Sequence, residues 1–114
     1  MTTNASLLKL KDKQKIKEHP LESVYAVAVI ESISDGNAYG FNQIKKNTGY
    51  ISSNTLSKVL GNLVQNGIVN RLVISTRPPH VEYSLTNKGL ELAHIVSEYY
   101  NWSAKWQNEA HNYI

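Results

Sequence analysis

The amino-acid sequence predicts a mostly α-helical α+β fold: a winged helix-turn-helix with a wing of two or three β-strands and a long C-terminal helix. Three observations predict it. Residues 52–66 have the period of an amphipathic helix, residues 68–85 have the two-residue period of a hairpin, and residues 87–112 return to helical period. One domain, residues 20–114, would contain all three segments.

The N-terminal segment, residues 1–19, is a predicted basic arm with lysine at every second position from Lys9 to Lys17. Such a polar, charged segment predicts a solvated arm, and contact with the phosphate backbone of a nucleic acid is the functional alternative. Pro20 favours the first turn of a helix. The apolar residues after it predict a central core helix, whose expected buried surface includes Leu21, Val24, Tyr25, Val27, Ala28 and Ile30.

Two short elements connect this core helix to the next long one. Residues 35–37, Asp-Gly-Asn, are turn formers, and residues 38–40 predict a short edge strand beside the hairpin. Residues 41–47 predict a short helix, and the turn Thr48-Gly49-Tyr50 follows it. Two helices joined by a turn that contains glycine are a helix-turn-helix. The short helix is expected to turn Phe41 and Ile44 inward and Lys45 and Lys46 outward.

The helix of residues 52–66 has an apolar face and a polar face. Ser52, after the apolar Ile51, is the expected N-cap, and Gly67 is expected to end the helix. The apolar stripe consists of Leu56, Val59, Leu60, Leu63 and Val64. The other face carries short polar side chains that can hydrogen-bond base edges or phosphates, although a merely solvated helix would show the same pattern. These are Ser53, Asn54, Ser57, Lys58, Gly61 and Asn62.

The predicted hairpin forms a wing whose expected tip is residues 75–80, because its two prolines cannot donate ladder hydrogen bonds. Arg77 and His80 flank this tip. In a winged module the tip lies along the phosphate backbone, where a cation adds affinity; a solvated loop charge is the alternative. Arg71 has two interpretations, a phosphate contact or a cross-strand pair with Glu82.

The last helix, residues 87–112, has Thr86 as its expected N-cap. Its apolar stripe recurs at alternating steps of four and three, which keeps one seam facing a partner helix. At ~1.5 Å per residue the helix would be about 40 Å long. We expect the stripe to meet its own copy in a homodimer, because exposed tryptophans would leave a large apolar patch; packing within one subunit is the alternative. The predicted interface is Leu92, Val96, Tyr99, Trp102, Trp106 and Tyr113.

Composition excludes several functional classes. Cysteine is absent, which excludes disulfides, thiolate metal sites and a thiol-based redox switch. The four histidines lack metal-ligand spacing and no nucleophile or phosphate-loop motif is present, so neither an enzyme nor a metal or other cofactor is expected. No apolar run predicts a membrane span or a signal peptide, which favours the cytoplasm. The net charge is +3, and residues 36–85 carry five cations against Glu82 alone.

Three groups of residues form a recognisable pattern: Ile51-Ser52 with the leucines of the following helix, Gly67-Ile68-Val69, and the run from Pro78 to Gly89. This pattern, over roughly residues 21–106, resembles the HxlR family of winged-helix transcriptional regulators. The resemblance implies homodimers built from the terminal helices, with one recognition helix in each subunit. Some family members sense oxidants or electrophiles through a cysteine near the start, which this chain lacks.

The sequence therefore predicts a homodimeric regulator that binds specific double-stranded DNA. Two recognition helices, residues 52–66, would enter successive major grooves about 34 Å apart. A winged helix that assembles proteins without reading DNA is the alternative. A cleft beside the long terminal helix could hold a small-molecule effector, which no residue identifies. The expected DNA contacts are Ser52, Ser53, Asn54, Ser57, Lys58 and Asn62 on the recognition helix, with Lys45, Arg71, Arg77 and His80.

Overall fold

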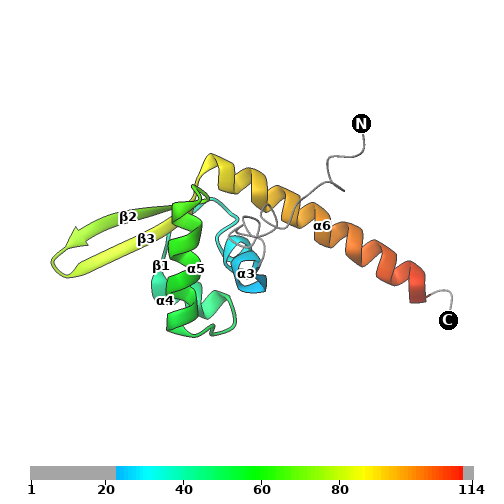
Figure 1. Cartoon of the computed structure of the whole chain (residues 1–114), viewed down its shortest axis with the longest axis horizontal. Helices are drawn as coiled ribbons and strands as arrows, with labels where there is room; N and C mark the ends of the chain where they lie inside the picture. The colour runs from blue at the N-terminus through cyan, green and yellow to red at the C-terminus, as the bar shows by residue number, and fades with distance from the viewer. Residues whose placement is uncertain (1–22, 112–114) are drawn as a thin grey trace, which may run out of the picture.

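The computed structural model describes residues 23–111 (Figure 1). The predicted arm of residues 1–19, the helix opening at Pro20 and Leu21, and Tyr113 lie outside this range. Within it, four helices accompany a three-stranded antiparallel sheet in the order β1-β3-β2, which confirms the predicted winged helix-turn-helix. The elements are α3 Val24–Ser32, β1 Tyr39–Gly40, α4 Phe41–Asn47, α5 Ser53–Gln65, β2 Val69–Thr76, β3 Pro79–Leu85 and α6 Asn87–His111.

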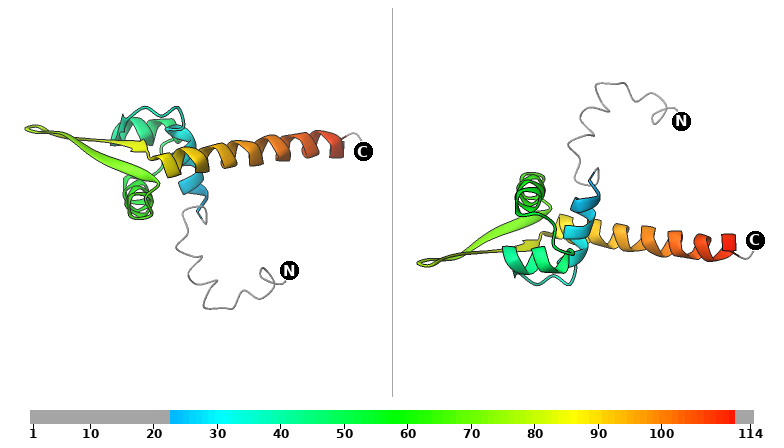
Figure 2. Two further views of the ribbon diagram at one scale, coloured as in Figure 1. Left: turned by 90° about the horizontal axis from the view of Figure 1, so that it is seen from above. Right: turned by 90° about the horizontal axis from the view of Figure 1, so that it is seen from below.

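The elements form a small helical body with two projections. Helices α3, α4 and α5 cluster at the centre, the β2-β3 hairpin extends to one side, and α6 extends to the other side (Figures 1 and 2). The core lies inside the body, where side chains of α3, α4 and α5 meet those at the base of the hairpin. Most of α6 therefore runs beyond the core of its own subunit.

Helix α3 buries a different face from the predicted one. Its N-cap is Ser23, whose hydroxyl oxygen accepts a hydrogen bond from the Tyr25 amide over 3.1 Å. Val24 and Tyr25 are 73% and 51% exposed, so their predicted burial was wrong. Every residue from Val24 to Ile30 is apolar or aromatic, and such a run does not reveal which face of the helix is buried. The buried residues are Ala26, Val29, Ile30 and Ile33.

Helix α5 has the predicted ends. The Ser52 hydroxyl oxygen accepts a hydrogen bond from the Thr55 amide over 3.2 Å, which confirms the N-cap. Gly67, with a φ of 72°, adopts the left-handed conformation that glycine tolerates. Its N–H donates to the Val64 carbonyl, and the next N–H donates to the Leu63 carbonyl, which together form a Schellman motif. The apolar stripe is buried at Leu56, Val59, Leu60 and Leu63.

The start of α6 is joined to the end of α5 by hydrogen bonds. The Thr86 hydroxyl donates to the Gly67 carbonyl over 2.6 Å and accepts from the Gly89 amide over 3.0 Å, which confirms Thr86 as the N-cap. Lys88 Nζ donates to the Asn66 carbonyl over 2.9 Å. The end of α5 and the start of α6 are therefore held together by direct hydrogen bonds.

Gly89 lies at this junction where two backbones come closest. A Cβ atom there would overlap the Ile68 carbonyl oxygen and would lie 3.0 Å from Leu85 Cδ2. Glycine is therefore required for steric reasons, because any side chain would push α6 away from the base of the hairpin.

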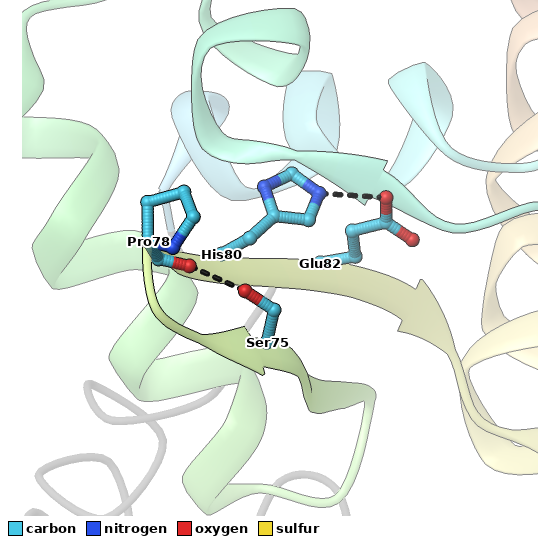
Figure 3. Close-up of polar contacts among 4 residues, drawn as sticks. All are labelled: Ser75, Pro78, His80 and Glu82. Atoms are coloured by element: carbon cyan, nitrogen blue, oxygen red, sulfur yellow. Dashed lines mark hydrogen bonds and ion pairs between the residues drawn. The ribbon is translucent and has the colours of Figure 1, made fainter.

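The tip of the wing is narrower than predicted. Strand pairing continues to Thr76 and Pro79, so the connecting loop is only Arg77-Pro78 instead of residues 75–80. Strand β1 pairs with β3 only as far as Glu82, so the edge of β3 at Pro79 is not paired with β1. The missing N–H of proline therefore removes no hydrogen bond between these two strands. The Ser75 hydroxyl donates to the Pro78 carbonyl across the turn (Figure 3).

The predicted turn between α3 and β1 forms around Asp35. Its carboxylate accepts hydrogen bonds from the Tyr39 hydroxyl and from the Asn37 amide. The Tyr39 hydroxyl, followed by the Asn37 amide, holds the pKa of Asp35 below its usual value of 3.8.

Tyr39→Phe should raise the pKa of Asp35 toward its ordinary value, because the largest cause of the lowering is removed. Since the native pKa is the lower one, this carboxylate stabilises the fold above its unfolded pKa, and the contribution is lost as the pH falls through the native pKa. NMR titration of the Asp35 carboxyl carbon in both proteins measures the shift. An unchanged pKa in the variant would contradict the assignment.

Candidate nucleic-acid interface

The polar face of α5 lies on the surface of the helical body. Ser52, Ser53, Asn54, Ser57 and Lys58 are exposed, while the opposite face of the helix is buried. The Ser52 hydroxyl is already used as the N-cap. The remaining four side chains occupy the first two turns of the helix, which is where a recognition helix contacts base edges.

Asn62 lies apart from these residues. It is half-buried and its side-chain oxygen accepts a hydrogen bond from Asn66 Nδ2 over 3.3 Å. It is ten residues from Ser52, about 15 Å along the helix axis. The structure therefore separates Asn62 from the cluster at the start of α5.

Lys45 joins the cluster from helix α4. Its Nζ donates a hydrogen bond to Ser53 Oγ over 2.9 Å, across the turn of the helix-turn-helix. The N-terminus of α5 is therefore flanked by a cation as well as by its own unpaired backbone N–H groups. Both features favour an anion at this position.

The cations of the wing are arranged differently from the prediction. Arg77 is exposed in the two-residue loop. Arg71 lies opposite Tyr83, so its alternative pairing with Glu82 was wrong, and Glu82 lies opposite Leu72. Arg71 is also exposed, which leaves its guanidinium available to a partner.

His80 is the group that contacts Glu82. Its Nε2 lies 3.0 Å from Glu82 Oε2, and the ring turns along β3 away from the tip (Figure 3). The structure thus places His80 beside a carboxylate instead of at the end of the wing. The predicted position of His80 at the tip followed from the overestimated loop length.

The stripe on α6 divides into two parts. Val96 is 5% exposed, so it belongs to the interior of its own subunit and not to the predicted interface, whereas Leu92 is half-buried and packs against the core. Farther along, Tyr99, Trp102 and Trp106 are 59%, 60% and 51% exposed. The rings of Tyr99 and Trp102 stack with centroids 6.2 Å apart. They form an aromatic surface that a single subunit leaves uncovered.

A groove of about 560 Å³ separates α3 from α6. It occupies the region where the sequence suggested space for a small molecule, between the long helix and the body. The lining is mostly polar and includes Glu31, Ser34, His94, Ser97, Tyr100 and Asn101.

Tyr50 was not among the predicted site residues, but it combines high exposure with an unusual backbone conformation. It is 70% exposed, it lies two residues before Ser52, the N-cap of α5, and it has a φ of 66°. An aromatic residue inside a turn motif was the available signal, but residue type alone does not reveal a left-handed backbone.

No helix among residues 23–111 combines the length and the apolar character needed to cross a membrane. In the same residues, no group of three or more His, Cys, Asp or Glu side chains is arranged to hold a metal ion.

The fold and the exposed face define the class of the protein as a winged helix-turn-helix: α4 and α5 form the helical motif and β2-β3 the wing. The chain belongs to the HxlR-like helix-turn-helix family, whose model matches residues 13–111. It is therefore a winged-helix member of a family of transcriptional regulators.

Individual relatives agree with this assignment. An uncharacterized HTH-type transcriptional regulator of Halalkalibacterium halodurans is 34% identical over 84 residues, which cover 74% of this chain and 74% of that protein. The solved structure of YtfH from Salmonella typhimurium has a TM-score of 0.70 at 26% identity and covers 88% of this chain and 87% of its own. The reduced form of the transcriptional regulator YodB from B. subtilis has a TM-score of 0.66 at 28% identity, with coverage of 85% and 92%.

Proposed function

We propose that this protein is a homodimeric transcriptional regulator that binds specific double-stranded DNA, with residues 20–114 as its DNA-binding and dimerisation unit. The observation that carries the proposal is the start of α5, where short polar side chains are exposed beside a cation held at the helix N-terminus. Small polar side chains let a helix approach the floor of the major groove closely.

The residues divide into two roles. Ser53, Asn54, Ser57 and Lys58 would contact base edges, because they lie on the exposed face of the first two turns. The phosphate contacts would come from cations around this face, of which the one on α4 is half-buried and the two on the wing are exposed. These are Lys45 on α4 and, on the wing, Arg71 and Arg77. Asn62 lies about 15 Å along the helix from Ser52 and His80 is paired with the carboxylate of Glu82, so both would contribute less.

The second subunit would contact the aromatic surface of α6, formed by Tyr99, Trp102 and Trp106. Burying three large aromatic side chains removes a patch that a soluble monomer would rarely expose. A twofold axis through this surface would place one recognition helix on each side, which suits an inverted-repeat site with centres about 34 Å apart.

A protein-assembly module is the second candidate, and one observation favours it. Leu72, Val73 and Ile74 are consecutive, apolar and exposed on β2, which is one of the two edge strands of the sheet. An exposed apolar edge suits strand addition by another protein. On this reading the purified protein would bind DNA weakly and without preference for sequence.

Arg77→Ala separates these candidates because it removes one proposed phosphate contact in each subunit. It should weaken binding to any duplex, and the slope of log affinity against log salt should fall by about 0.9 per subunit. Asn54→Ala should instead weaken binding to the promoter site more than binding to an unrelated duplex, with the slope unchanged.

Fluorescence anisotropy of labelled duplexes at several salt concentrations measures both quantities. Lys105→Ala on α6 is the matched control: it removes a cation distant from the wing and should keep the wild-type slope. An Arg77→Ala protein with the wild-type slope would show that the wing does not contact phosphate.

A further inference from the structure

Tyr50 holds a backbone conformation that its residue type disfavours. Its φ of 66° lies in the left-handed region, directly after Gly49 with a φ of 81°. Glycine adopts this region freely, whereas a bulky side chain is strained there. The conformation is held by a hydrogen bond of 2.9 Å from the Tyr50 N–H to the Lys45 carbonyl.

Packing of the Tyr50 side chain within the subunit does not offset this backbone strain. It is 70% exposed, whereas the next residue, Ile51, is buried in the core. Glycine at position 50 would allow the same turn, and replacing tyrosine by glycine would remove no buried side chain. Strained residues that contribute little to packing are concentrated at functional sites.

Hydrogen bonds connect Tyr50, through Lys45, to the proposed interface. The Tyr50 amide donates a hydrogen bond to the Lys45 carbonyl, and Nζ of the same lysine donates one to Ser53 Oγ in the first turn of α5. Ile51 and Ser52, the N-cap of α5, lie between Tyr50 and Ser53 in the sequence. Tyr50 is therefore exposed in the turn that leads directly into the first turn of α5, whose polar face would meet the major groove.

We propose that Tyr50 is a DNA-backbone contact, with its phenolic hydroxyl donating a hydrogen bond to a phosphate oxygen at the edge of the groove that α5 enters. The inference rests on the proposed DNA binding. Tyrosine is a neutral donor of the kind that positions proteins on the phosphate backbone, and it adds no charge. It would fix the depth and angle of the recognition helix while Lys45 supplies the local cation.

Two substitutions test the contact. Tyr50→Phe removes only the hydroxyl group, and its affinity for DNA should fall about fivefold per subunit, the worth of one hydrogen bond. Tyr50→Gly removes the side chain and relieves the strained backbone, so its melting temperature should equal or exceed that of the wild type while its affinity falls at least as much. A merely structural role cannot lower affinity while stability rises.

The losses should be the same on the promoter duplex and on an unrelated duplex, and the salt slope should not change, because an uncharged phosphate contact is lost. Tyr25→Phe, an exposed tyrosine on α3, is the control and should bind as the wild type does. Full affinity in both Tyr50 variants would overturn the proposal, and so would a loss confined to the promoter duplex. Failure of the wild type to bind DNA at low salt would instead overturn the proposed function.

Discussion

Gly89→Ala should destabilise the fold by about 3 kcal/mol and lower the melting temperature by roughly 10–20 °C. A methyl group there would overlap the Ile68 carbonyl oxygen and crowd Leu85 Cδ2 at 3.0 Å. Neither backbone can yield easily, because Ile68 is held by the Schellman motif and Gly89 by the Thr86 cap. The effect is a large fraction of the stability of a small domain. Thermal and urea denaturation followed by circular dichroism measure it.

Gly61→Ala is the matched control for this prediction. Gly61 lies within α5 and has no atom within 4 Å of the position that a Cβ would occupy. Alanine is the better helix former by about 1 kcal/mol, so this variant should be more stable than the wild type. Equal stabilities for the two variants would show that the close approach of α6 to the hairpin base is not rigid.

The double variant Trp102→Glu, Trp106→Glu should convert the protein from a dimer to a monomer. Both indoles are about half exposed in one subunit and belong to the proposed interface. Aromatic residues at the centre of an interface commonly contribute 2 kcal/mol or more each, so we expect the dimer dissociation constant to rise at least about 100-fold. Promoter affinity should fall with it, because a monomer presents only one recognition helix. Sedimentation velocity over a concentration series measures the change.

Ala104→Glu places the same charge on the same helix between the two tryptophans. It is exposed, and residues two apart in a helix point to different sides. This control should remain a dimer with unchanged promoter affinity. A double variant that dimerises as tightly as the wild type would exclude the aromatic surface as the interface.

The ends of the helices were predictable because their chemistry is local. The capping hydrogen bonds at Ser52, Gly67 and Thr86 each involve backbone groups within a few residues, so the sequence around them contains most of the information. The buried face of α3 was not predictable in this way. Its residues are apolar all around, and only packing against α5 and α6 selects Ala26 and Val29 over Val24.

In the candidate site too, features set by the local sequence were predictable and features set by packing or strand pairing were not. The exposed face of α5 followed from helical period, because one side is apolar and the other polar. The partner of Glu82 depended on hairpin register, and a shift of the register between Val73 and Ser75 places Leu72 opposite it. On α6, steps of four and three do not distinguish packing within a subunit from packing between subunits, so Val96 was assigned to the wrong surface.

Titration of a promoter duplex from the protein's own locus, between about 50 and 200 mM salt, tests the central claim most directly. Three proposed phosphate-binding cations in each subunit, Lys45, Arg71 and Arg77, predict a slope of log affinity against log salt near −5, at a stoichiometry of two chains per site. The promoter duplex should bind more tightly than a scrambled one. A flat salt response, or equal affinity for both duplexes, would contradict a dimeric reader of DNA sequence.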